Sequence, residues 1–410
     1  MLTSLALIFL LGPLLGGIFV KLKLPSLLGM LITGIILGPY ALNLLDQSIL
    51  SISADLRELA LIIILIRAGV SLNVTDLKKV GRPAILMCFV PACFEILGMI
   101  IIAPKLLGIS ILNAAIMGAV VGAVSPAVIV PKMLYLMENK YGTNKSIPQM
   151  IMAGASVDDV FVIVIFTAFT GLAQGNNISA SSFLRIPVSI VSGLLGGVIT
   201  GLILSVWFQK KQIRDSVKVI ILLSISFLLV TLGKILPIPF SGLLAVMSMG
   251  AVLYKKSPNV ARRLSVKFSK LWIGAEILLF VLVGATVDLN YALSAGFSAV
   301  LLIFSVLIFR MMGVFFCVIK TKLSYREILF CMVAYMPKAT VQAAIGSIPL
   351  AMGLSCGNIV LTVAVLAILI TAPLGALGID ITYKRLLLKD NSVESKDKER
   401  EPNISDADVT

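Results

Sequence analysis

The sequence contains no histidine, and this absence excludes several kinds of site. Histidine is the commonest metal ligand in proteins and the side chain whose charge ordinarily changes near neutral pH. The five cysteines fall in or beside apolar stretches, without the close spacing of a metal site or a disulfide framework. Any response to pH must therefore come from carboxylates or lysines in unusual surroundings.

Charged residues are also scarce. They form 13% of the chain, compared with about 25% in ordinary soluble domains, while the mean hydropathy is +1.07. Apolar runs of about 20 residues recur along the chain, each long enough to cross a hydrocarbon core of about 30 Å. No run shows the period-two alternation of a transmembrane barrel strand. The sequence predicts an all-α polytopic membrane protein.

About thirteen transmembrane helices are predicted. Their ranges are 2–20, 24–41, 53–71, 83–103, 109–131, 148–174, 186–207, 217–234, 238–254, 271–288, 294–319, 326–351 and 356–383. Basic residues concentrate in the loops on one side, whereas the opposite loops offer only Lys105, Arg185 and Lys234. The positive-inside rule then predicts an outside N-terminus and a cytoplasmic C-terminus. Because this asymmetry explains the net charge of +14, we expect no nucleic-acid partner.

The chain divides into a membrane block and a tail. Residues 1–385 form the predicted transmembrane transporter domain. Residues 386–410 are polar, mixed in charge and almost free of apolar side chains, which predicts a disordered cytoplasmic tail.

Two of the predicted spans carry helix-breaking residues. Pro126 follows Ser125 in the fifth span, and Pro337 precedes Lys338 in the twelfth. Proline lacks an amide donor and clashes with the preceding turn, so we expect both helices to break near the middle of the membrane. Paired interruptions at corresponding places in two halves indicate inverted repeats with a transport site between them.

Two adjacent aspartates, Asp158 and Asp159, interrupt the apolar stretch GASVDDVFVIVIFTAFTGL. A charge near the bilayer centre costs about 2.5–3.5 kcal/mol, and two like charges at close range resist joint ionisation. Such a pair suits cation binding, proton carrying or both, because a proton and a cation compete for one negative site. Oxygen ligands suit hard cations, so three hydroxyls are further candidates. These are Ser125, Ser156 and Thr340.

Three more charges, Glu95, Arg310 and Lys338, are expected well inside the hydrocarbon region. Buried charges are normally paired. Our preferred hypothesis pairs Arg310 with Glu95 as a structural clamp and places Lys338 opposite the aspartates. The alternative, in which Arg310 pairs with Asp158, stays open at this point.

Three motifs carry a family resemblance, namely GAVVGAVSPAVIVP, GASVDDV and YMPKATVQAAIGSIP in this order. They resemble the cation/proton antiporter superfamily, in particular its NHA-type sodium/proton exchanger branch. The resemblance implies inverted repeats with two crossed broken helices, and exchange of Na⁺ or Li⁺ for H⁺. It also implies that Asp159 is the main ion-binding carboxylate and that Asp158 is its partner in electrogenic exchange.

The same resemblance implies a division of labour in the membrane block. A mobile core would comprise residues 83–174 and 294–385, a dimerisation part residues 1–71 and 217–288, and a linker helix residues 186–207. We therefore expect a homodimer with an elevator-like motion, in contact with membrane lipids, in a bacterial inner membrane. No cofactor or resident metal is expected.

Other functions are less consistent with these residues. A sodium-coupled organic-anion symporter of related fold would need a roomier polar cavity. A K⁺/H⁺ antiporter stays an alternative, because the sequence does not give the preference among Na⁺, Li⁺ and K⁺. An enzyme is not expected, because the sequence offers no nucleophile–base pair, metal set or phosphate loop. The sequence departs from the family pattern at Arg310. Many electrogenic relatives have a lysine in the eleventh span, which can release a proton, whereas arginine does not deprotonate. The number of protons exchanged per cation therefore stays open.

Overall fold

The computed structural model describes residues 1–71, 81–174, 180–211, 213–235 and 240–389. The predicted disordered tail lies almost wholly outside these residues. The regular secondary structure of the described residues is helical apart from one isolated antiparallel bridge, between Tyr141 and Lys389. The prediction of an all-helical protein is confirmed.

One group of helices surrounds α14. Its members are α1 (Leu2–Lys21), α2 (Ser26–Leu37), α3 (Gln47–Ser51), α4 (Ser53–Ser71), α11 (Ala180–Lys210), α12 (Asp215–Ile235), α13 (Gly242–Lys256) and α14 (Pro258–Ala285). Glycines let these helices approach closely: a Cβ added to Gly250 of α13 would lie 2.9 Å from the Cα of Gly69 on α4. Small residues at such contacts are the usual means by which membrane helices pack.

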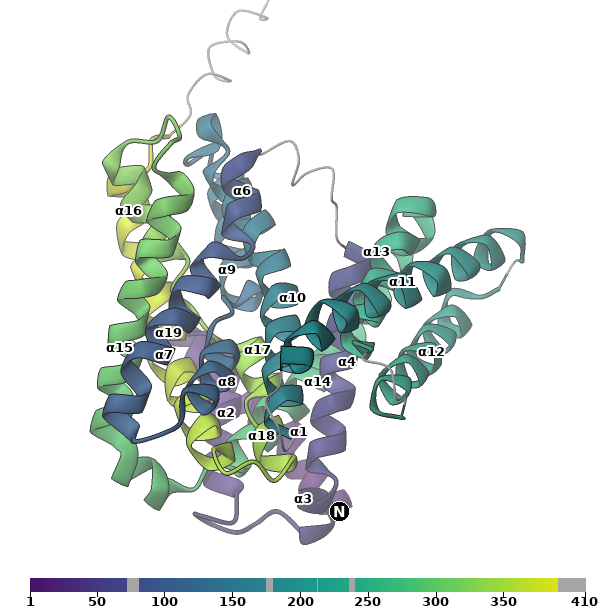
Figure 1. Ribbon diagram of the computed structural model, residues 1–410, viewed down its shortest axis with the longest axis horizontal. Coiled ribbons are helices and arrows are strands. Elements are labelled where there is room, and N and C mark those ends of the chain that lie inside the picture. The colour runs from purple at the N-terminus through teal and green to yellow at the C-terminus, as the bar shows by residue number, and fades with distance from the viewer. Residues whose placement is uncertain (72–80, 175–179, 212, 236–239, 390–410) are drawn as a thin grey trace, which may run out of the picture.

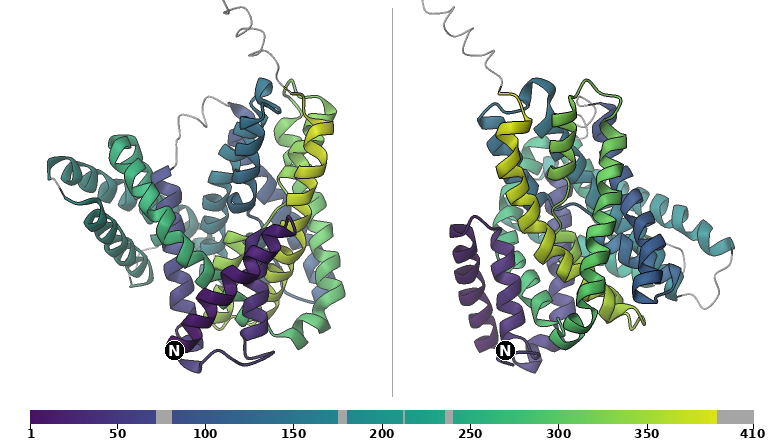
Figure 2. Two further views of the ribbon diagram at one scale, coloured as in Figure 1. Left: turned by 180° about the vertical axis from the view of Figure 1, so that it is seen from behind. Right: turned by 90° about the vertical axis from the view of Figure 1, so that its left-hand side faces the viewer.

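The second group contains the buried charges. Its members are α6 (Arg82–Met87), α7 (Val90–Leu107), α8 (Ile111–Val121), α9 (Pro126–Glu138), the 3₁₀ turn η1 (Thr143–Lys145), α10 (Ile147–Gln174), α15 (Leu289–Val318), α16 (Tyr325–Ala334), α17 (Thr340–Ile345), α18 (Ile348–Ala351) and α19 (Gly357–Leu386). Figures 1 and 2 show these helices packed together, while α11 and α12 of the first group project on the far side of α4. The predicted core and dimerisation parts lie in the second and first group, respectively. That these groups act as a core and a dimerisation part stays a prediction.

The count of thirteen membrane crossings also stays a prediction. Each predicted range contains helix, but in the described residues nine helices are long and apolar enough to span a membrane. The helix α2 has only 12 residues and α13 only 15.

Both predicted helix breaks are present. The first separates α8, which ends at Val121, from α9, whose first residue is Pro126. The second separates α16, which ends at Ala334, from α17, which begins at Thr340. The two breaks touch, because the backbone N–H of Ser125 donates to the Pro337 carbonyl at 2.8 Å. Pro126 fits the first position of α9, and Pro337 lies between the two helices, where no helical N–H is needed.

Candidate functional site

The end of α8 presents three successive carbonyl groups to side chains of other helices. A helix end leaves its last carbonyls without partners inside the helix. Val121 O accepts from Lys338 Nζ at 2.7 Å, Gly122 O accepts from Arg310 Nη1, and Ala123 O accepts from Gln342 Nε2 at 2.8 Å. Two of these donors are cations, which the negative end of a helix dipole favours.

Asp158 is fully buried on α10 and faces the first break. Its Oδ2 atom accepts from Val124 N at 2.8 Å and from Arg310 Nη2 at 3.0 Å. Its Oδ1 atom is buried and has no hydrogen-bond partner among the described residues. One half of this carboxylate is therefore fixed, whereas the other half is open to a ligand.

Glu95 on α7 joins the two basic residues. Arg310 Nη1 lies 2.8 Å from Glu95 Oε2, and Lys338 Nζ lies 2.7 Å from the Glu95 carboxylate. Arg310 Nε also donates to Tyr335 O at 2.7 Å. Both pairings that the sequence left open occur, because Arg310 contacts Glu95 and Asp158 at once. Lys338 differs from expectation because it pairs with Glu95 rather than with the aspartates.

These charges balance except at one position. If all are ionised, Glu95 and Asp158 compensate Arg310 and Lys338, so the four together are neutral. Asp159 is half-buried, and its Oδ1 atom has no hydrogen-bond partner in the described part of the chain. An uncompensated carboxylate in such surroundings attracts one monovalent cation or one proton.

The predicted oxygen ligands lie at the same crossing but their role is untested. The hydroxyls of Ser125 and Thr340 are buried, and neither has a partner among the residues described. The Ser156 side chain falls outside the described residues. The two predicted helix-breaking residues, Pro126 and Pro337, shape the backbone around the crossing.

Several residues of this network were not foreseen. Besides Gln342, they include Tyr335 and Thr371, whose Oγ1 accepts from Lys338 N at 3.0 Å. Gln342 could have been found, because it is an amide in an apolar stretch four residues after Lys338. Nothing in the residue pattern indicates the three carbonyl acceptors, since every residue has one.

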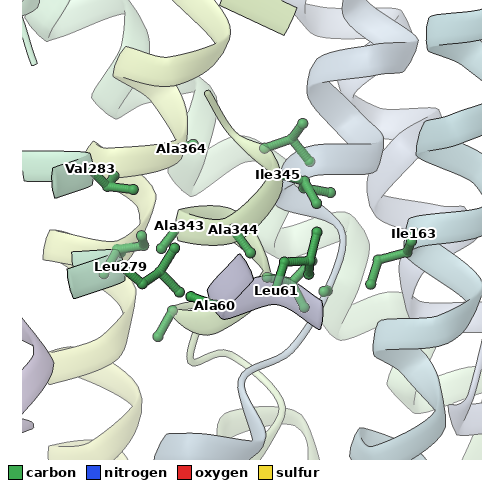
Figure 3. Packing of buried hydrophobic residues seen from close by; sticks show 14 of the residues in the cluster. Ala60, Leu61, Ile163, Leu279, Val283, Ala343, Ala344, Ile345 and Ala364 are labelled. Atoms are coloured by element: carbon green, nitrogen blue, oxygen red, sulfur yellow. The ribbon is translucent and has the colours of Figure 1, made fainter. Parts of the chain in front are cut away.

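An apolar layer lies where α17, the helix that follows the second break, meets α4 and α14. The helix α17 packs there between α4 and α14, as Figure 3 shows. The layer consists of the buried residues Ala60, Leu61, Leu279, Val283, Ala343, Ala344 and Ile345. It offers no polar side chain that could replace the water around an ion.

The sequence is similar to that of known transporters. Residues 6–385 match the family model described as "Sodium/hydrogen exchanger, transmembrane". Human sodium/hydrogen exchanger 9B2 is 35% identical over 394 residues, covering 92% of this chain and 72% of that protein. Human sodium/hydrogen exchanger 9B1 is 30% identical over 378 residues, covering 89% and 73%. These vertebrate relatives give no support to the predicted bacterial origin.

The fold is similar to that of a solved antiporter. The sodium proton antiporter MjNhaP1 from Methanocaldococcus jannaschii, in its structure at pH 8, aligns with a TM-score of 0.81. The alignment covers 93% of this chain and 97% of MjNhaP1, at 21% sequence identity. The antiporter fold implied by the three motifs is thereby confirmed. Sodium/hydrogen exchangers are transporters and not enzymes, and this chain belongs to the transmembrane sodium/hydrogen exchanger family.

Proposed function

We propose that this protein exchanges Na⁺ for H⁺ across a membrane, and that the two ions compete for Asp159 with Asp158 beside it. The observation that carries the proposal is the charge balance. Of the five charges named at the crossing, Glu95, Asp158, Arg310 and Lys338 neutralise one another, and the Asp159 carboxylate is left without a basic partner among the described residues. The Oδ1 atoms of both aspartates are open to an ion. Such a site is stable with one cation or one proton and unstable with neither, so loading one ion releases the other.

The kind of cation follows from the ligands. Carboxylate and hydroxyl oxygens select hard cations, and both types occur at the crossing without a partner among the described residues. We propose Na⁺ as the main substrate and Li⁺ as a secondary substrate. Exchange of K⁺ is the outcome that would revise this order.

Alternating access is supported by the apolar layer on one side of the crossing. With the predicted orientation of the termini, this layer would lie on the outer side, and we propose that it closes the crossing to the outside. Opening requires α17 to move away from α4 and α14, which belong to the other group of helices. We propose that the group containing α17 is the mobile core of a homodimer, and that the group around α14 is the fixed dimerisation part in the lipid.

The number of protons per sodium ion depends on Asp158. Electrogenic exchange, as predicted from the sequence, needs a second proton carrier besides Asp159. Here Asp158 is paired with Arg310, whose guanidinium does not release its proton. The charge balance therefore supports one proton per sodium ion, whereas electrogenic exchange would require Lys338 or Asp158 to carry a proton as well.

Proton movement in proteoliposomes tests the proposal. The purified protein is reconstituted with an internal pH-sensitive dye and given pulses of Na⁺, Li⁺ or K⁺, with and without a clamped membrane potential. Proton movement driven by Na⁺ or Li⁺ supports the exchanger, and its dependence on voltage decides between the two ratios. Folded protein that moves no protons with any cation would refute the proposal and favour sodium-coupled symport.

A further inference from the structure

Gln342 is a buried amide on α17 that the proposed exchange cycle does not use. Its Nε2 atom donates to Val121 O at 3.1 Å and to Ala123 O at 2.8 Å. Its Oε1 atom is buried and has no partner among the described residues. The opposite orientation of the amide would turn this oxygen towards two carbonyl oxygens, so the contacts determine which atom is the nitrogen.

The bond to Ala123 O reaches Asp158 through a single peptide group. The carbonyl of Ala123 and the N–H of Val124 belong to the same peptide bond, and Val124 N donates to Asp158 Oδ2 at 2.8 Å. The described residues contain no cis peptide bond. Because the carbonyl and the N–H of a trans peptide point in opposite directions, Gln342 and Asp158 hold the same planar group from its two sides.

This peptide group has little else to fix it. It lies between the end of α8 and the start of α9, outside the hydrogen-bond ladder of either helix. The carbonyls before it are held by charged side chains, Val121 O by Lys338 and Gly122 O by Arg310. In the part of the chain that the structure describes, Ala123 O accepts a hydrogen bond only from Gln342.

We propose that Gln342 is a positioning residue of the exchange site, which orients the Ala123–Val124 peptide group and through it the Asp158 carboxylate. The proposal rests on the proposed function, since it concerns the same ion site. Without Gln342 the peptide group can turn, so Asp158 keeps Arg310 but loses a fixed N–H donor. Hydrogen bonds in a chain also strengthen one another, so loss of the first weakens the second.

The effect should appear in cation binding rather than in the maximal rate. A misplaced Asp158 leaves its Oδ1 atom badly oriented towards the ion shared with Asp159, which weakens binding. At saturating Na⁺ the site is filled, and the rate depends on movement of the helices. A residue that mattered only for folding would instead lower the amount of active protein.

The test compares Gln342→Met, Gln342→Asn and the wild type in proteoliposomes. Methionine keeps the length of the side chain without its donors, and asparagine keeps the amide on a shorter stem. We expect Gln342→Met to raise the KM for Na⁺ about tenfold, because the hydrogen bond from Val124 N to the charged Asp158 carboxylate is no longer held in place, with the maximal rate changed less than about twofold. Gln342→Asn should lie between Gln342→Met and the wild type.

Thr170→Val is the matched control, because it removes a buried hydrogen bond from the same helix as Asp158, to Phe166 O at 2.9 Å, away from the crossing. Its KM should equal that of the wild type. A wild-type KM in Gln342→Met, or a loss confined to the maximal rate, would overturn the proposal.

A second readout separates this inference from the proposed function. The Na⁺ concentration that half-maximally raises the melting temperature in detergent reports binding without transport, with choline chloride as the control salt. This midpoint should also rise about tenfold in Gln342→Met. If the wild type binds Na⁺ but moves no protons, the proposed exchange function is refuted. The Na⁺ midpoint of thermal stabilisation still tests the role of Gln342 in that case. An unchanged midpoint overturns the role of Gln342 alone.

Discussion

At the scale of single residues, Asp159 is the carboxylate that the buried charge network leaves uncompensated. We predict that Asp159→Asn lowers exchange by more than about 100-fold, because the only site that must hold a cation or a proton becomes neutral. The same change should raise the melting temperature, since it removes an unpaired charge from a half-buried position. Proteoliposome flux and thermal unfolding in detergent measure the two effects. Wild-type exchange in a folded variant would contradict the central claim.

The neighbouring substitution Asp158→Asn is chemically identical and should have the opposite effect on stability. Asp158 is ion-paired with Arg310 at 3.0 Å, so its loss leaves Arg310 and Lys338 sharing Glu95 alone. Breaking a buried pair by removing one partner costs about 3–5 kcal/mol. We therefore predict a clear fall in melting temperature for Asp158→Asn, measured beside Asp159→Asn. Equal melting temperatures would contradict the charge balance.

Some of these residues could be predicted from the sequence and others could not, for a physical reason. Glu95, Arg310 and Lys338 stand out because a charge in an apolar run is costly unless it is used or paired. Their pairing could not be derived, since the partners lie on different helices, 215 residues apart for Glu95 and Arg310. The sequence pattern does not set how one helix is rotated towards another. Gln342 escaped notice because a neutral amide costs far less to bury than a charge.

At the scale of elements, α17 is the helix on which opening and closing depend. It packs between α4 and α14 through small side chains, among them Ala343 and Ala344. We predict that Ala343→Phe reduces the exchange rate at least tenfold with little change in the Na⁺ midpoint of thermal stabilisation. The added ring overfills a close-packed contact, which costs about 1–3 kcal/mol and hinders the closed state.

The control for this prediction is Leu374→Phe on α19, where the same ring replaces an exposed side chain. Exchange by this variant should match the wild type. If Ala343→Phe also exchanges at the wild-type rate, the apolar layer is not a gate. If it loses Na⁺ binding as well, the layer belongs to the ion site itself.

The breaks show how far elements could be predicted. Pro126 and Pro337 located both interruptions, because proline cannot continue a helix hydrogen-bond ladder. A further interruption, between Ile345 and Ile348, was not predicted. Gly346 there lies against Ala364 of α19, and a Cβ at this position would come within 2.8 Å of the Ala364 Cβ. Such a close approach is a tertiary requirement that the local sequence does not reveal.

At the scale of the whole molecule, the two groups of helices differ in how they are held together. The group around α14 is joined by close backbone contacts at glycines such as Gly69 and Gly250. The other group is built around the buried charges, and its helix α17 meets α4 and α14 of the first group through apolar side chains. An apolar contact without hydrogen bonds or ion pairs can separate at lower cost than either, because lipid and protein surfaces are similarly apolar. The sequence indicated the buried charges of one group but not the close glycine contacts of the other, since the helices of both groups are apolar.

The residues that follow α19 contact the connection between α9 and α10. The Gly142 N–H donates to Leu388 O at 2.8 Å, and Leu387 is buried with its side chain within contact of Gly142. This strap, residues 387–389, ties the end of α19 to the connection that leads into α10, the helix of the two aspartates. Burial of one leucine side chain contributes about 1.5–3 kcal/mol.

Two truncations that differ by the three strap residues test whether the strap stabilises the protein. We predict that ending the protein after Lys389 leaves the melting temperature unchanged, because every strap contact is kept. Ending it after Leu386 should lower the melting temperature by several degrees, since the buried side chain and the hydrogen bond are both lost. Because the strap reaches α10 through a connection outside the membrane-buried charge network, the KM for Na⁺ should be the same in both. Equal melting temperatures would show that the strap does not hold α19, and a raised KM in the shorter protein would show that it also shapes the ion site.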